Sequence, residues 1–443
     1  MPVKTRIAPS PTGRFHIGTA RTALFNYLYA KKSRGSFCIR IEDTDKERSK
    51  AEYETEILEG LAWLGLEADE FVRQSERVSR HAELLAGLIA NDAAYISREP
   101  SKSDEGKTVE VVRLRNPGRS VTFHDEIRGD ITFDTTELGD FVIARTTSDP
   151  IYHFAVVADD MDMGITHVIR GEDHISNTPR QILIQEALGA PRPAYAHLPL
   201  ILDEKRAKMS KRSGQATAVM DYRAEGVLPE ALNNYLALLG WNPGDDREFF
   251  SLAELCEAFS LERVQKSGGV WNRDKLFSVN QHWMRALDDE TFAKAIGIDG
   301  VDSAMIRKAA PLVKERAHTF KEAREMLSTD LQCLFAEPIL VRESLLRKEL
   351  PDRAHLTAEA LQKLTTLIAV LPEPTTPARA KEALMPYADR EEEKGKGGRG
   401  AVLWALRYAL SGQERSPDPF TLISLLGKED ALRRIDAALA LIS

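Results

Sequence analysis

Two short segments, far apart in the sequence, carry residue types that bind phosphate. The first, His16-Ile-Gly-Thr19, opens a helical pattern and follows the proline- and glycine-containing stretch Pro9–Gly13. Free amides and the positive end of a helix dipole favour anions at such a place. The second, Lys208-Met-Ser-Lys-Arg212, is a compact cationic loop. Each segment alone has another interpretation, because a histidine before a helix can be a simple N-terminal cap and most basic clusters are solvated turns.

The first segment lies within a predicted βαβ unit. Val3–Ala8 and Phe37–Ile41 are predicted to be short buried strands, and Ala20–Ala30 has the apolar spacing of a helix. Strand, helix and strand in this order predict a parallel sheet. Ligands of such sheets bind at the carboxyl ends of the strands, where Ser10 and Glu42 stand.

The strand pattern is interrupted and then resumes. Tyr152–Val157 and His167–Arg170 are predicted to be further strands, and Asp159–Asp162 a solvated turn, since its spacing does not match a calcium loop. Residues 91–150 are predicted to be a β-rich insert. It contains a polar loop at Ser97–Lys107 and short strands at Val109–Leu114, Val121–Phe123, Ile131–Asp134 and Phe141–Ala144.

The C-terminal part is predicted to be helical. From His282 to Ser443 the apolar period stays near 3.6, with a charged, glycine-rich solvent loop at Asp389–Gly400. The predicted fold class is therefore α/β. A Rossmann-like parallel-sheet domain is split by a short β-rich insert and followed by an all-α region.

Composition restricts the class of protein. The chain has 443 residues, of which 43% are hydrophobic, and a net charge of −8, which does not exclude a local basic surface for nucleic acid. No apolar run approaches the roughly 20 residues of a membrane helix, and the start lacks a signal segment, so we expect a cytoplasmic protein without membrane contact. The three cysteines, Cys38, Cys256 and Cys333, are isolated and predicted to be buried, inert thiols.

The two segments together resemble the His-Ile-Gly-His and Lys-Met-Ser-Lys-Ser signatures of class I aminoacyl-tRNA synthetases. Thr19 stands where that class has its last signature histidine. Arg6–Gly13, Arg40–Asp45 and Ile169–His174 are similar to glutamyl-tRNA synthetases of the bacterial type. The resemblance implies a catalytic domain (1–90 and 151–200), a connective-peptide insert (91–150), a stem-contact domain (201–281) and an anticodon-binding region (282–443, with an internal boundary at about 370–390).

The resemblance also implies a reaction and its site. Glutamate would be attached to tRNA(Glu) by way of a glutamyl-adenylate, with ATP and Mg²⁺, by a monomeric enzyme. His16 and Lys211 would be catalytic. The implied ATP-binding residues are Thr12, Gly13, His16, Gly18, Thr19, Glu172, Lys208, Met209, Ser210, Lys211 and Arg212. The implied glutamate-binding residues are Arg6, Ala8, Ser10, Glu42, Tyr152 and Arg170.

Several alternatives stay open at this point. Arg6 or Arg170 can be a structural ion pair with Glu42 or Glu172. Glu172 and Asp173 can be plain loop carboxylates. Some relatives carry zinc in the insert, but Ala94–Arg115 contains no Cys or His, so we expect no structural metal. Basic residues of this kind more often belong to a solvated surface than to a nucleic-acid contact. With that interpretation favoured for each one alone, the candidate tRNA contacts are Arg273, Lys275, Arg307, Lys308, Lys314, Arg316, Lys321, Arg324, Lys394, Lys396 and Arg399.

Rival functions differ in specificity or in class. A non-discriminating enzyme would also charge tRNA(Gln). A glutaminyl enzyme, with its β-barrel anticodon domain, and a truncated glutamyl-queuosine relative are disfavoured by the helical C-terminal half. A binding module without catalysis is favoured by Thr19 but disfavoured by the presence of His16, Lys211, Arg6 and Arg170.

Overall fold

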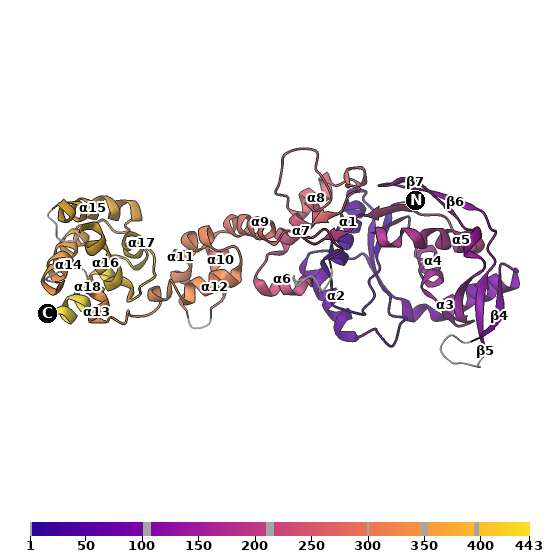
Figure 1. Cartoon of the computed structure of the whole chain (residues 1–443), viewed down its shortest axis with the longest axis horizontal. Coiled ribbons are helices and arrows are strands. Elements are labelled where there is room, and N and C mark those ends of the chain that lie inside the picture. Colours follow the sequence, from indigo (N-terminus) through magenta and orange to yellow (C-terminus); the bar gives the residue numbers. More distant parts are fainter. Residues whose placement is uncertain (1, 101–107, 210–216, 299–300, 347–352, 394–397) are drawn as a thin grey trace. The chain divides into compact units, whose positions relative to one another are not determined.

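The computed structural model describes residues 2–100, 108–209, 217–298, 301–346, 353–393 and 398–443 (Figure 1). They form two compact units, Met1–Asn280 and Gln281–Ser443. The finer divisions within each unit remain predictions. Among the described helices, none has the length and apolar character that crossing a membrane requires.

A parallel sheet forms the centre of the first unit. Its strands are β1 (Lys4–Ile7), β2 (Ser36–Ile41), β3 (Glu70–Arg73), β10 (His167–Gly171) and β11 (Ala194–Leu198). β1, β2 and β3 pair in that order, and β10 pairs with β11. The amide of Thr166 donates to the Lys4 carbonyl at 3.0 Å, which places β10 on the other side of β1. The strand order therefore reverses between β1 and β10, the position where parallel sheets bind ligands.

The helices that accompany this sheet follow the predicted pattern in most places. They are α1 (Ile17–Lys32), α2 (Ala51–Trp63), α3 (Val78–Ala90, preceded by a 3₁₀ turn at Gln74–Arg77), α4 (Tyr152–Asp162) and α5 (Thr178–Leu188). Helix α1 begins three residues before the predicted start, because the side chain of His16 caps its first turn.

The predicted strand at Tyr152–Val157 is wrong, because these residues begin helix α4. Every residue from 154 to 160 is buried. A short apolar run does not distinguish a buried strand from a helix buried on all sides, since neither shows a polar face. The predicted solvated turn at Asp159–Asp162 is also wrong. It is the end of α4, and Asp159 and Asp160 are buried against arginine side chains.

The strands of the insert belong to two different sheets. An antiparallel sheet contains β4 (Ala94–Pro100), β5 (Thr108–Leu114), β8 (Phe141–Thr146) and β9 (Asp149–Pro150). The hairpin of β6 (Ser120–Asp125) and β7 (Gly129–Asp134) instead extends the parallel sheet, with Asp125 opposite Tyr195 of β11. The predicted loop at Ser97–Lys107 is wrong for its first four residues, because Ser97 to Pro100 pair with β5; residues 101–107 lie outside the described residues.

Insert and parallel sheet share one hydrophobic core. Leu85 of α3 and Phe154 of α4 belong to the same buried cluster as Val112 of β5 and Ile143 of β8. Burial of apolar surface contributes roughly 25 cal/mol per Å², so this shared core holds the insert in a defined position on the catalytic sheet.

The rest of the first unit follows β11 in the chain and includes the described end of the second basic segment, Lys208 and Met209. It contains a two-stranded pair, β12 (Ile201–Leu202) and β13 (Gly269–Val270), and helices α6 (Val219–Glu225), α7 (Pro229–Leu238), α8 (Leu252–Ala258) and α9 (Arg273–Ala286), the last of which continues into the second unit. Helix α8 begins at Ser251, whose side chain forms a capping box with Glu254.

The described part of the second unit contains helices and no strand. They are α10 (Asp289–Ile296), α11 (Ser303–Arg316), α12 (Phe320–Ser328), α13 (Arg342–Leu345), α14 (Arg353–Ala369), α15 (Pro377–Glu393), α16 (Gly398–Ser411), α17 (Pro419–Leu426) and α18 (Lys428–Ile442). The predicted loop at Asp389–Gly400 is wrong at both ends, since α15 continues to Glu393 and α16 begins at Gly398. A charged run can also continue a helix as its solvated face.

Two other expectations also need correction. Lys314, a candidate tRNA contact, is buried and donates to Asp289 at 2.7 Å. Its charge is therefore used within the unit.

Cys38 and Cys333 are buried, and burial raises the pKa of each thiol to about 11. Cys256 is only half-buried, because it stands at the margin of the apolar face of α8.

Candidate active site

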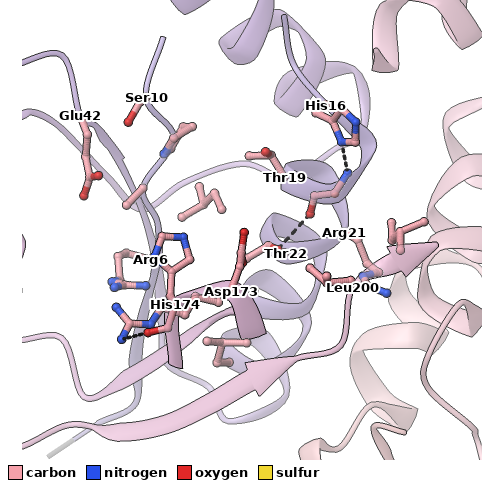
Figure 2. A pocket seen from close by; sticks show the side chains of 18 of the residues that line it. Arg6, Ser10, His16, Thr19, Arg21, Thr22, Glu42, Asp173, His174 and Leu200 are labelled. Carbon is pink, nitrogen blue, oxygen red and sulfur yellow. Dashed lines mark hydrogen bonds between the residues drawn. The ribbon is translucent and has the colours of Figure 1, made fainter. Parts of the chain in front are cut away.

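A pocket of about 460 Å³ lies at the carboxyl ends of β1, β2 and β10 (Figure 2). Polar groups at the strand ends, among them Arg6 and Glu42, lie on one side of the pocket (Figure 2). The first turns of α1, with His16 and Thr19, form the opposite side. Most of the predicted site residues line it: Arg6, Ala8, Ser10, His16, Gly18, Thr19, Glu42, Tyr152, Arg170, Lys208 and Met209.

Six predicted residues are not brought to the pocket wall by the described structure. Thr12, Gly13 and Glu172 do not line it, and Ser210, Lys211 and Arg212 lie outside the described residues. The carboxylate of Glu172 instead pairs with Arg128 and accepts the amide of Leu200 at 2.8 Å. It thereby joins the end of β10 to the insert and to the segment after β11.

His16 organises the helical side of the pocket. Its Nδ1 accepts the amide hydrogen of Gly18 at 3.0 Å and so caps α1. Nδ1 must therefore be unprotonated, and the neutral ring carries its hydrogen on Nε2. A Cβ at position 18 would lie 3.3 Å from His16 Nδ1, a tight contact with the capping ring. The cap interpretation and the ligand interpretation of His16 are thus compatible, because they use different ring nitrogens.

We expect His16→Asn to separate these two roles. The asparagine oxygen can still accept from the Gly18 amide, so the free energy of unfolding should stay within about 0.5 kcal/mol of wild type, whereas His16→Ala should lose about 1 kcal/mol. Both variants lose the Nε2–H donor, so the tRNA charging that the sequence resemblance implies should fall at least about tenfold in both. Denaturant unfolding and steady-state charging of the two variants provide the test. Wild-type charging by His16→Asn would limit His16 to its capping role.

The described end of the second basic segment closes onto the same pocket. Lys208 pairs with Asp173 through Nζ and Oδ2 at 2.8 Å. Met209 is buried, and its amide donates to the carbonyl of Ile201 at 3.0 Å. These contacts fix Lys208 and Met209 at the pocket wall.

Arg170 is a buried cation without a carboxylate partner among the described residues. Its Nε donates to His197 at 3.1 Å, Nη1 to the Gln181 carbonyl oxygen at 2.7 Å, and Nη2 to Thr178 at 2.8 Å. Only 6% of the residue is exposed, and burial lowers the pKa of its guanidinium. The alternative interpretation of Arg170 as a structural ion pair with Glu42 or Glu172 is wrong, because neither carboxylate is its partner. An uncompensated buried charge is costly, so this site favours an anionic ligand.

Arg6 belongs to a network of alternating charges. Its guanidinium donates to Asp160 at 3.1 and 3.2 Å, and Arg40 Nη1 donates to the same carboxylate at 2.6 Å. Arg40 Nη2 in turn donates to Glu42 at 3.1 Å. Burial raises the pKa of Glu42 against the influence of Arg40, whereas Arg6 and Arg40 overcome the effect of burial and lower the pKa of Asp160. The structural ion pair of Arg6 thus exists, but with Asp160.

Two guanidinium groups, of Arg6 and Arg170, and the carboxylate of Glu42 line the strand-end side of the pocket. Arg6 and Glu42 already have charged partners in the network, whereas Arg170 pairs with no described carboxylate. A ligand with one carboxylate near the guanidinium groups and one ammonium near Glu42 would match this distribution of charge.

Three titratable residues that line the pocket are absent from the predicted set. Arg21, 3% exposed, donates to the carbonyls of Pro199 and Leu239. His174 contacts the Tyr152 hydroxyl through Nδ1 at 3.2 Å, and burial beside Arg170 lowers its pKa to about 4. Asp173 is the third. A signal existed for Arg21, because it is the only charged residue among apolar positions in the first turns of α1.

Comparison with known proteins agrees with this architecture. The model of the family "tRNA synthetases class I (E and Q), catalytic domain" matches residues 2–103 and 96–278, and that of an anticodon binding domain matches residues 261–439. A glutamate tRNA ligase from Elizabethkingia meningosepticum, solved in complex with its amino acid, is 30% identical, with 100% of both chains covered and a TM-score of 0.82. The glutamate-tRNA synthetase of Elizabethkingia anophelis is 29% identical, with 99% of this chain and 100% of that chain covered and a TM-score of 0.78.

Fold, site and these matches define a class I aminoacyl-tRNA synthetase, which is a ligase. Within that class, the chain belongs to the family of glutamate and glutamine tRNA synthetases.

Proposed function

We propose that this enzyme attaches glutamate to tRNA(Glu) at the expense of ATP. The observation that carries the proposal is Arg170, a buried guanidinium that faces the pocket and pairs with no described carboxylate. Glutamate supplies the missing anion with its side-chain carboxylate, and glutamine does not. The solved relatives are named as enzymes for glutamate, which agrees with this choice.

In this proposal, separate groups of the pocket bind the different parts of glutamate. Arg170 and Arg6 read the side-chain carboxylate, with Tyr152 beside them, and Glu42 pairs with the α-ammonium. The backbone at Ala8 and the Ser10 hydroxyl complete the wall. The α-carboxylate is then left to face the helical side of the pocket, where the nucleotide would lie.

The reaction takes place between these two sides. An oxygen of the α-carboxylate attacks the α-phosphorus of ATP, the bond to the bridging oxygen breaks, and pyrophosphate leaves. A hydroxyl of the terminal adenosine of the tRNA then attacks the carbonyl carbon of the glutamyl-adenylate and expels AMP. His16 Nε2–H and the amides near Gly18 would stabilise the growing phosphate charge, with Lys211 proposed to close over the pyrophosphate.

Mg²⁺ is expected to accompany ATP, held by phosphate oxygens and water. Within the described ranges, no cluster of three or more His, Cys, Asp or Glu side chains is placed to hold a metal ion. The helical second unit, which contains most of the match to an anticodon binding domain, is proposed to contact the tRNA.

Charging of purified tRNAs with labelled glutamate tests the proposal. We expect ATP-dependent incorporation into tRNA(Glu), with full-length enzyme and tRNA present throughout. Incorporation into tRNA(Gln) at a similar rate would identify a non-discriminating enzyme and would keep the amino-acid assignment. Failure to charge either tRNA with glutamate would refute the proposal.

A further inference from the structure

A buried hydrogen-bonded chain connects the insert to the pocket arginine. Asp125, at the end of β6, accepts from His197 Nδ1 at 2.6 Å, and His197 Nε2 accepts from Arg170 Nε at 3.1 Å. Asp125 and His197 are fully buried and do not line the pocket. Within the described ranges, the hydrogen bond from Arg170 to His197 connects this pair to the pocket wall.

The chemistry of the three groups fixes the direction of every bond in this chain. An arginine can only donate, so His197 Nε2 must be the acceptor and must carry no hydrogen. The ring hydrogen is then on Nδ1 and is donated to Asp125, which is the arrangement that a carboxylate imposes on a histidine. Burial lowers the pKa of His197 despite the opposing effect of Asp125, which keeps the ring neutral.

Asp125 is itself held in place by the backbone. Its Oδ1 accepts the amides of Ile127 at 3.0 Å and Arg128 at 2.9 Å, and its Oδ2 also accepts the amide of His197 at 3.1 Å. All these partners are donors, so the site demands an ionised carboxylate. Burial opposes ionisation, but His197 and these amides together lower the pKa of Asp125.

The chain limits how Arg170 can present its hydrogens. With Nε held by His197 and Nη2 by Thr178, and one Nη1 hydrogen taken by Gln181, the plane of the guanidinium is fixed. Nη1 has no second hydrogen-bond acceptor among the described residues. Precise placement of a binding group requires such a supporting layer of hydrogen bonds.

We propose that Asp125 and His197 are positioning residues that orient Arg170 for the side-chain carboxylate of the amino acid, so that the insert contributes to amino-acid specificity. This proposal rests on the assignment of glutamate as substrate. It assigns β6 a role in the amino-acid site through its contact with β11.

Steady-state charging by His197→Leu and His197→Gln tests the role. Leucine removes the acceptor and leaves buried partners unsatisfied, so KM for glutamate should rise about tenfold or more, with kcat changed less than about threefold and KM for ATP unaffected. The preference of His197→Leu for glutamate over glutamine should also be smaller than that of wild type. Glutamine can accept from Arg170 with its side-chain oxygen and donate to Asp125 with its side-chain NH₂ group. The KM of His197→Gln for glutamate should therefore stay close to that of wild type.

His81→Leu is the matched control. His81 Nε2 lies 2.7 Å from Asp159 Oδ1 in a second buried histidine–aspartate pair, outside the pocket wall. The free energy of unfolding of His81→Leu should fall by about as much as that of His197→Leu, while the KM of His81→Leu for glutamate stays within about threefold of wild type. Unchanged KM in His197→Leu, or equal losses in His197→Leu, His197→Gln and His81→Leu, would overturn the proposal.

An independent readout does not require His197→Leu to fold. In full-length wild type labelled with ¹⁵N-histidine, the His197 signals, assigned by their absence in His197→Gln, should show the hydrogen on Nδ1. A hydrogen on Nε2 would refute the orienting chain, whether or not the enzyme charges tRNA. Failure of wild type to charge glutamate would instead refute the proposed function and leave this readout intact.

Discussion

Replacement of Arg170 by alanine is expected to lower kcat/KM for glutamate in tRNA charging about 10³-fold, equivalent to about 4 kcal/mol. Truncation of one partner of a buried, hydrogen-bonded charge pair costs about 2–5 kcal/mol in binding, and here it leaves the substrate carboxylate without its guanidinium. KM for ATP should change little, because Arg170 belongs to the carboxyl end of β10, whereas His16 caps α1 on the helical side of the pocket. Steady-state charging with both substrates varied provides the measurement.

Arg170→Lys is the matched comparison. Lysine keeps the charge but not the planar fork that His197, Gln181 and Thr178 orient. We expect the kcat/KM of this variant for glutamate to lie between those of wild type and Arg170→Ala. The change in KM should be larger than the change in kcat. In either variant, the loss in free energy of unfolding should be far smaller than the free-energy equivalent of the loss in kcat/KM, since Arg170 has no described ion-pair partner to lose. Near-wild-type selectivity in Arg170→Ala would contradict its role as the carboxylate reader.

Asp160→Asn is expected to destabilise the first unit by about 3–5 kcal/mol. The variant leaves the buried guanidinium groups of Arg6 and Arg40 without the carboxylate that bridges them at 2.6–3.2 Å, and it turns an amide donor towards one of them. Calorimetry of the full chain should show the transition of the first unit at lower temperature. The control is Asp162→Asn, since Asp162 pairs with Arg77 and Arg80 at a partly exposed position and should lose at most about 1 kcal/mol.

The same variant has a predictable pH dependence. The folded-state pKa of Asp160 lies below its ordinary value of 3.8, so its carboxylate contributes stability above that pH and loses it as the pH falls further. The difference in stability between wild type and Asp160→Asn should therefore be constant near neutral pH and shrink below about pH 4. A difference that is small at pH 7, or that grows in acid, would show that the bridging role is wrong.

Local patterns were sufficient to predict much of the fold. The strands at Lys4–Ile7 and Ser36–Ile41 and the helix that follows His16 have clear apolar spacing and clear ends, so their positions were predicted to within a few residues. The same holds for the carboxyl strand ends, where Ser10, Glu42 and Arg170 were expected to meet and do line one pocket.

Contacts between distant residues could not be predicted in this way. The partner of Arg6 is Asp160, 154 positions away, and it stands on a helix that the apolar run of Tyr152–Val157 did not distinguish from a strand. Asp125 and His197 have no recognisable spacing, because a hairpin of the insert brings them together only when it joins β11. A pattern records periodicity along the chain, whereas pairing of buried charges depends on which elements become neighbours.

The central claim is that this pocket selects an amino acid by its side-chain carboxylate. The most direct measurement is the ratio of kcat/KM for glutamate and glutamine in ATP-dependent charging of tRNA(Glu) by the wild-type enzyme. A site built around a buried cation should prefer glutamate by about 10⁴ or more, because glutamine leaves Arg170 uncompensated. Comparable values for the two amino acids, or a preference for glutamine, would contradict the account.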